Sequence, residues 1–141
     1  MAMEFVWGMT EKNWRNFKHD HELKNFRGDG SGHCDFSEDY DWYGNCCVGN
    51  LCAEILHTCD DSDETSWYSY ANIFALGIDD GYGETNEGKI PYALLRDSFK
   101  VPIGCKTFES FKKEFEKRFT KMINEKEQYK KLANMPLGNW N

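Results

Sequence analysis

The clearest hydrophobic pattern in the sequence lies near its C-terminal end. Apolar side chains recur there at helical spacing over some 25 residues, which predicts an amphipathic helix over 108–133 with one buried face. Thr107 is a natural N-cap, and Pro136 follows the expected end of the helix. The stripe consists of Phe108, Phe111, Phe115, Phe119, Met122, Tyr129 and Leu132. We expect this helix to be the spine of the domain; the alternative is a dimer or partner helix with a basic outer face.

The outer face of this helix carries oppositely charged residues four positions apart. Such i,i+4 pairs stabilise a helix by roughly 0.2–0.5 kcal/mol each. The expected pairs are Glu109 with Lys113, Glu114 with Arg118, and Glu127 with Lys131.

Other apolar patterns predict shorter elements. Apolar residues at steps of three and four predict a helix over 47–59, with Cys52 and Cys59 on its buried face. Residues 64–77 show aromatic residues at helical spacing, with a strand as the alternative because aromatic residues favour strands. A third helix is expected after the N-cap candidate Thr10, and a short one from Pro91 through Phe99.

The remaining segments favour strands and loops. Residues 4–9 predict a short strand, 27–32 and 79–83 predict turns, 35–44 an irregular edge segment, and 101–104 a loop or edge strand. We therefore expect an α+β fold, in which one compact, helix-rich domain over 1–141 combines a long C-terminal helix with a small sheet. The alternative is a mostly α fold. A chain of 141 residues is long enough to bury a substantial core.

Charge changes this picture, because acids and bases occupy different parts of the chain. The stretch 28–88 contains fourteen Asp and Glu residues and no Lys or Arg, so it is formally −14, while the flanks are +7. It also contains nine aromatic residues, whereas disordered acidic tails are poor in them. We therefore expect this stretch to fold and to display its charge on a surface.

This composition favours a binding protein whose partner is basic. Segregated charge builds a field that steers a basic partner, and it disfavours direct binding of nucleic acid by this stretch. By analogy of composition, small phage-encoded inhibitors of nucleases and CRISPR effectors work in this way, and immunity proteins that neutralise nuclease toxins use the same physics. Aromatic residues dominate interface hot spots. The expected partner-binding residues are Asp35, Glu38, Asp39, Asp41, Trp42, Tyr43, Asp60, Asp61, Asp63, Glu64 and Trp67.

A metal- or thiol-dependent enzyme built on the Cys- and His-rich segment 33–59 is the competing hypothesis. Its Cys and His residues lack the repeated paired spacing of zinc sites, so we expect no metal site and no cofactor; a structural zinc site is the alternative. A Cys nucleophile with His33 or His57 as base needs an electropositive setting, which a segment without basic residues does not provide. No catalytic residue is therefore assigned.

The N-terminal residues do not resemble a signal peptide, because no basic region precedes an apolar core in residues 1–10. The expected location is therefore the cytoplasm. In that reducing compartment the six cysteines are expected to be thiols, mostly buried.

Overall fold

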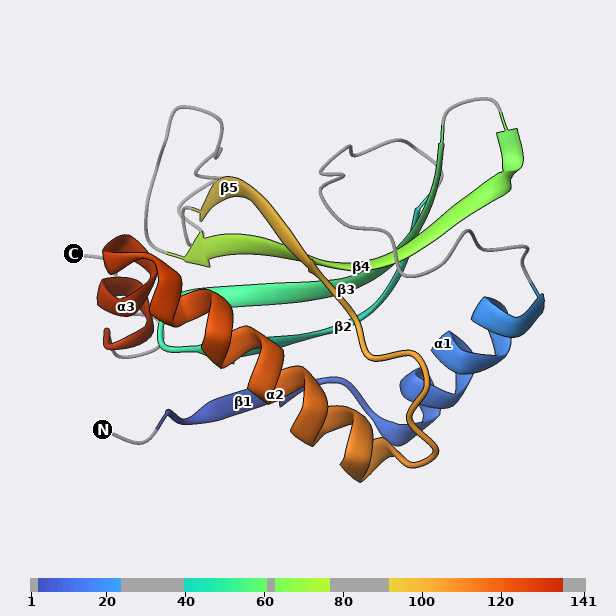
Figure 1. Ribbon diagram of the computed structural model, residues 1–141, viewed down its shortest axis with the longest axis horizontal. Helices are drawn as coiled ribbons and strands as arrows, with labels where there is room; N and C mark the ends of the chain where they lie inside the picture. Colours follow the sequence, from blue (N-terminus) through green and yellow to red (C-terminus); the bar gives the residue numbers. More distant parts are fainter. Residues whose placement is uncertain (1–2, 24–39, 61–62, 77–91, 136–141) are drawn as a thin grey trace, which may run out of the picture.

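The computed structural model describes residues 3–23, 40–60, 63–76 and 92–135. Its five strands form one antiparallel sheet in the order β1-β2-β3-β4-β5, and three helices accompany it. Figure 1 shows α2 crossing the sheet diagonally, with α3 and α1 toward opposite ends. The α+β class is confirmed. The elements are β1 (Phe5–Gly8), α1 (Glu11–Leu23), β2 (Tyr40–Val48), β3 (Leu51–Asp60), β4 (Asp63–Leu76), β5 (Tyr92–Lys100), α2 (Phe108–Glu125) and α3 (Glu127–Ala133).

The sheet is larger than the sequence pattern predicts, because two segments expected as helices are strands. The helix expected over 47–59 is wrong: this segment is the hairpin of β2 and β3, closed by the pair Val48 and Leu51. The short helix expected from Pro91 is also wrong, since β5 occupies 92–100. For residues 64–77 the alternative holds, as they belong mainly to β4. The end of the irregular segment expected over 35–44 belongs to β2.

The turn between β2 and β3 docks on the end of α3. Gly49 has a positive φ of 56°, a conformation that glycine adopts without steric cost. A Cβ there would lie 2.4–2.7 Å from carbonyl oxygens of Leu132, Ala133 and Met135, so only glycine fits. The Asn50 N–H donates to the Leu132 carbonyl oxygen at 2.9 Å, satisfying an acceptor at the helix end. The hairpin tip therefore holds α3 in place.

The C-terminal helix is confirmed in its start and its buried face, and it consists of two pieces. Thr107 caps α2, because its hydroxyl oxygen accepts from the Ser110 N–H at 3.1 Å. Lys126 has extended backbone angles and separates α2 from α3. The ion pair of Arg118 with Glu114 is present at 3.4 Å. The two other expected pairs differ by one residue: Lys112 pairs with Glu109, and Lys130 pairs with Glu127.

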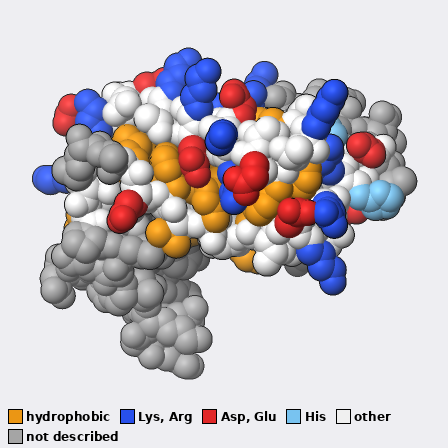
Figure 2. Space-filling view, turned by 90° about the horizontal axis from the view of Figure 1, so that it is seen from below, with side chains coloured by type: hydrophobic (Ala, Val, Ile, Leu, Met, Phe, Trp, Pro, Cys, Tyr) orange, Lys and Arg blue, Asp and Glu red, His pale blue; other side chains and the backbone are white. Residues whose placement is uncertain are grey.

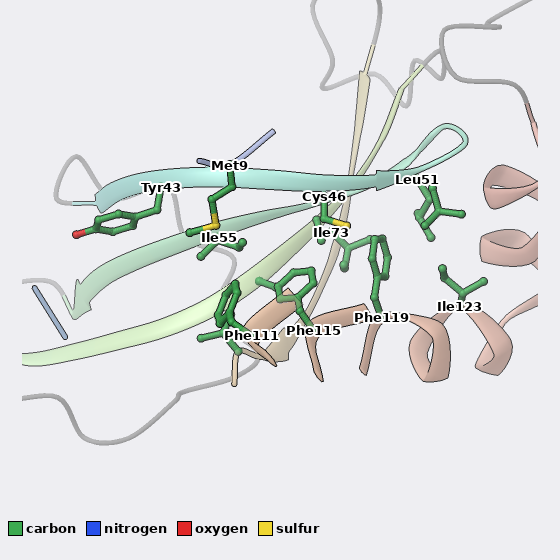
Figure 3. Packing of buried hydrophobic residues seen from close by; sticks show 14 of the residues in the cluster. Met9, Tyr43, Cys46, Leu51, Ile55, Ile73, Phe111, Phe115, Phe119 and Ile123 are labelled. Carbon is green, nitrogen blue, oxygen red and sulfur yellow. The ribbon is translucent and has the colours of Figure 1, made fainter. Parts of the chain in front are cut away.

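The main core lies between α2 and one face of the sheet. Phe111, Phe115, Phe119 and Ile123 are fully buried and point from α2 toward the strands (Figure 3). They meet buried strand residues that share that face, among them Cys46, Leu51, Ile55 and Ile73.

The opposite face of the sheet also contains buried residues. Cys52, Leu56 and Tyr70 are at most 2% exposed there. Because both faces of β3 are buried, it shows no alternation of apolar and polar residues.

Candidate functional site

The predicted partner-binding residues that the structure describes gather toward one end of the sheet. There β2 begins, β3 ends and β4 begins, and the register sets Asp41 opposite His57 and Asp60 opposite Asp63. We call this region the acidic end and define it by Asp41, Asp60 and Asp63. Of Asp60, Asp63, Glu64 and Trp67 only the backbone is described, and Asp35, Glu38, Asp39 and Asp61 lie outside the described residues.

Two consecutive residues of β2 at the acidic end are exposed. Asp41 is exposed, and the Trp42 side chain is 51% exposed although its strand partner Leu56 is buried. Among the described residues, Trp42 and Val6 are the exposed large hydrophobic side chains. The half-exposed Trp42 ring can offer an apolar contact to a partner, while Asp41 points to the other face of β2.

Tyr43, the next residue, lies in the core and connects the acidic end to α1. It is 6% exposed, and its ring packs edge-on against that of Phe17 with 5.4 Å between the ring centroids. Its hydroxyl donates to the Asp20 carboxylate. Burial, followed by the hydrogen bond and charge of Asp20, raises the pKa of the Tyr43 hydroxyl well above its usual range. Tyr43 therefore stays neutral and holds α1 against β2. The ladder shifts register between Trp42 and Gly44, which accommodates the change of direction.

Histidine side chains fill the space between α1 and the strands. His57 is fully buried, and its ring centroid lies 4.5 Å from that of Phe17 and 4.6 Å from that of Tyr43. His21 of α1 approaches the buried Ser69 of β4, with 2.9 Å between Nδ1 and Oγ. These contacts attach α1 to three neighbouring strands beneath the acidic end. Buried between aromatic rings, His57 is placed as a packing residue.

The cysteines differ from the prediction that all are thiols. Cys47 and Cys52 face each other across the β2–β3 hairpin and form a disulfide, with 4.1 Å between their Cα atoms. Cys46 is a buried free thiol whose pKa is raised well above its usual range by burial and by the charge of Glu116. Cys105 is a partly exposed free thiol.

The described Cys and His residues can be compared with the needs of a thiol- or metal-dependent enzyme. A nucleophilic thiol needs a lowered pKa, which is the opposite of what Cys46 shows. Among the described residues, no group of three or more His, Cys, Asp or Glu side chains is arranged to hold a metal ion. His33, Cys34 and the Cys59 side chain lie outside the described part of the chain.

A polar row on the sheet face opposite α2 was not foreseen from the sequence. The register aligns Asn45, Glu54, Asn72 and Ser98 across β2 to β5. The Asn72 side chain is 1% exposed, and it lies close enough to Glu54 to lower the pKa of the Glu54 carboxyl. Neither the Nδ2 nor the Oδ1 atom of Asn72 has a partner at good hydrogen-bond geometry. Burial is the stronger effect and leaves the pKa of Glu54 raised. The four residues are far apart in sequence, so only strand pairing reveals the row.

Within the described residues, no helix has the length and apolar character needed to cross a membrane. Comparison with known proteins adds no identity, because no family model, curated protein or solved structure matches the chain significantly.

Proposed function

We propose that this protein is a non-enzymatic, acidic binding protein that inhibits a basic, nucleic-acid-handling partner, as phage-type anti-defence or anti-CRISPR inhibitors do. The observation that carries the proposal is the segregation of charge: fourteen carboxylates and no Lys or Arg over 28–88. Net charge alone keeps a protein soluble, whereas segregated charge creates a directional field. Such a field raises the association rate with a partner of opposite sign.

The acidic end combines the two features that a nucleic-acid-binding protein recognises. Its carboxylates take the place of phosphates, and the half-exposed Trp42 takes the place of a stacked base. Asp41 is exposed at the neighbouring position, where its side chain points to the other face of β2. Tyr43 contributes by holding β2 against α1 through Asp20, which positions Trp42. An immunity protein that neutralises a nuclease toxin would use the same surface in the same way.

The proposed location is the cytoplasm, where a nuclease or CRISPR effector acts on nucleic acid; in that reducing compartment Cys47 and Cys52 would be thiols. Partners of this class hold rows of Lys and Arg that normally contact phosphates. Duplex DNA and this protein should therefore compete for one surface on the partner.

A capture experiment with DNA as competitor tests the proposal. Immobilised protein is incubated with a bacterial lysate at low salt, and bound proteins are then eluted with duplex DNA. We expect DNA to release nucleic-acid-binding proteins whose activity on DNA the free protein inhibits. The proposal fails if the captured proteins are indifferent to DNA, or if their activity is unchanged.

Binding kinetics with the captured partner then separate steering from anchoring. Reversing Asp39 and Asp41 to Lys should lower the association rate, as added salt does, because exposed charges are screened over roughly 8 Å at physiological ionic strength. Trp42→Ala should mainly raise the dissociation rate. Glu4→Lys, with half the charge change, and Val6→Ala are controls, since Glu4 is exposed outside the acidic stretch and Val6 is 50% exposed on β1. An association rate that ignores both salt and the Asp39/Asp41 reversal would contradict the acidic-face mechanism.

A further inference from the structure

The outer face of α2 carries a row of lysines that the fold itself does not use. Lys113, Lys117 and Lys121 are exposed and follow one another at steps of four, so they project from the same side of the helix. Within the described residues none of them forms an ion pair. Like charges at this spacing destabilise a helix by a few tenths of a kcal/mol, roughly 0.2–0.5 per pair. We call these three residues the lysine row.

Two acids of α2 beside the row are already engaged by other bases, and Glu116 accepts a hydrogen bond from Trp7 Nε1 at 2.8 Å. Glu109 binds Lys112 at 3.0 Å, and Glu114 binds Arg118 at 3.4 Å. On the face seen from below, Figure 2 shows Lys and Arg side chains interspersed with acidic side chains around a band of hydrophobic side chains. The lysine row is therefore available to an acidic group from outside the described fold.

A groove of about 480 Å³ lies beside the end of this row, between α2 and β5. Lys100, Arg118 and Lys121 contribute positive charge to its lining, and Met122 contributes apolar surface. Arg118 holds the groove together, because its Nη1 donates to the Lys100 carbonyl oxygen at 2.8 Å. β5 is the last strand in the order of the described sheet, so its outer edge borders the groove.

Two acids also line the groove, and one of them is engaged by α3 and by the residue before it. Asp97 already accepts hydrogen bonds from the Tyr129 hydroxyl at 2.8 Å and from Lys126 at 3.1 Å, so its charge is matched. Glu125 is the other lining acid. Arg118 is paired with Glu114, so Lys121 is the lining base that continues the lysine row into the groove.

We propose that the lysine row and the β5–α2 groove bind the acidic end of a second copy of this chain. The chain contains both complementary surfaces, since residues 28–88 are formally −14 and the flanks are +7. This contact joins unlike surfaces, so each added copy leaves one acidic end and one lysine row free. Contacts of this head-to-tail kind form rings when the rotation closes and growing assemblies when it does not. Self-association rests on the charge distribution alone and does not depend on the proposed function.

Sedimentation velocity over a range of protein concentrations tests the proposal. At about 0.01 M salt, where charges interact over about 30 Å, we expect the mass to rise above that of the 16.5 kDa monomer as concentration increases. At about 1 M salt, where the range is about 3 Å, the protein should be monomeric. A protein that remains monomeric at every concentration in low salt would overturn the proposal.

Two complementary variants identify the surfaces. The first reverses the lysine row (Lys113→Glu, Lys117→Glu and Lys121→Glu), and the second neutralises the acidic end (Asp41→Asn, Asp60→Asn and Asp63→Asn). Each alone should weaken self-association roughly tenfold or more, the combined effect of three exposed ion pairs. A mixture of the two should form a dimer that grows no further, because the lysine row of the second variant and the acidic end of the first remain intact.

A third variant controls for net charge. Lys12→Glu, Lys106→Glu and Lys131→Glu make the same charge change at exposed positions away from the row. We expect this variant to associate more strongly than the lysine-row variant by roughly tenfold. Equal weakening of both, or a mixture that stays monomeric, would show that no specific surface is involved. Circular dichroism confirms that α2 remains helical in each variant.

Discussion

Removing the Phe115 side chain should strongly destabilise the protein, because this ring lies at the centre of the α2–sheet core. Phe115 is fully buried, and its ring centroid lies 5.1 Å from that of Trp7 and 5.0 Å from that of Phe99. Phe111 and Phe119 also contact it, at 5.9 and 6.3 Å. Phe→Ala in a core typically costs about 3–5 kcal/mol, and ring pairs contribute about 0.5–1.5 kcal/mol beyond burial.

We expect the cost of Phe115→Ala to lie near the upper end of that range. The substitution leaves a cavity, and the rings around it belong to elements docked on one another, so the cavity cannot easily close. The free energy of unfolding of such domains is about 5–15 kcal/mol in total, so Phe115→Ala should remove a large part of it. Urea denaturation monitored by tryptophan fluorescence measures the change in the free energy of unfolding. Phe115→Leu, which leaves most of the volume filled, should cost less and keep the protein folded if the Ala variant unfolds.

Lys113→Ala on the same helix is the matched control. Its side chain is exposed and forms no ion pair within the described residues, so the free energy of unfolding should change by no more than about 0.5 kcal/mol. A Phe115→Ala cost below about 1 kcal/mol, similar to that of Lys113→Ala, would show that α2 is not docked on the sheet as described.

Three further perturbations test other parts of the fold. Replacing Cys47 and Cys52 by Ser should lower the free energy of unfolding by about 2 kcal/mol, because the disulfide restricts the unfolded chain by closing a short loop. In urea denaturation, reductant should destabilise the wild type but not the variant. Glu54→Gln should stabilise the protein at neutral pH, because the raised pKa of Glu54 means that ionising this carboxyl in the folded state costs stability. This gain over the wild type should vanish as the pH falls below the ordinary glutamate pKa of about 4.3, and a gain that persists there in acid denaturation would contradict the assignment. Tyr43→Phe keeps the ring but removes the hydrogen bond to Asp20, so it should cost about 1.5–3 kcal/mol; no change in thermal or urea stability would show that this bond does not hold α1.

The secondary structure that the sequence predicted correctly depends on local signals. Thr107, with Ser110 three residues later, starts α2 through hydrogen bonds within one turn, and the Phe111 and Phe115 positions repeat at the helical period. A single buried face against an exposed one makes this period readable. Thr10 caps α1 for the same local reason, since the Asn13 N–H donates to its hydroxyl oxygen at 3.1 Å.

The hairpin of β2 and β3 shows where the pattern failed. Leu51, Cys52, Ile55 and Leu56 are buried, but they face opposite sides of the sheet. Their steps of three and four are those of a helix, and burial of both faces removes the alternation that would indicate a strand. One local signal was present, because Gly49-Asn50 between apolar residues is a typical two-residue hairpin turn.

The sequence by itself determined the charge of the acidic stretch and the presence of Trp42 within it, because composition needs no coordinates. The tertiary structure decided the rest. A register shift in β2 turns Tyr43 into the core while Trp42 stays half-exposed, and pairing across the hairpin brings Cys47 and Cys52 together as a disulfide. The direction of a strand side chain depends on register, and a shift of one residue reverses it. Register is set by contacts between residues distant in sequence, which a local pattern does not contain.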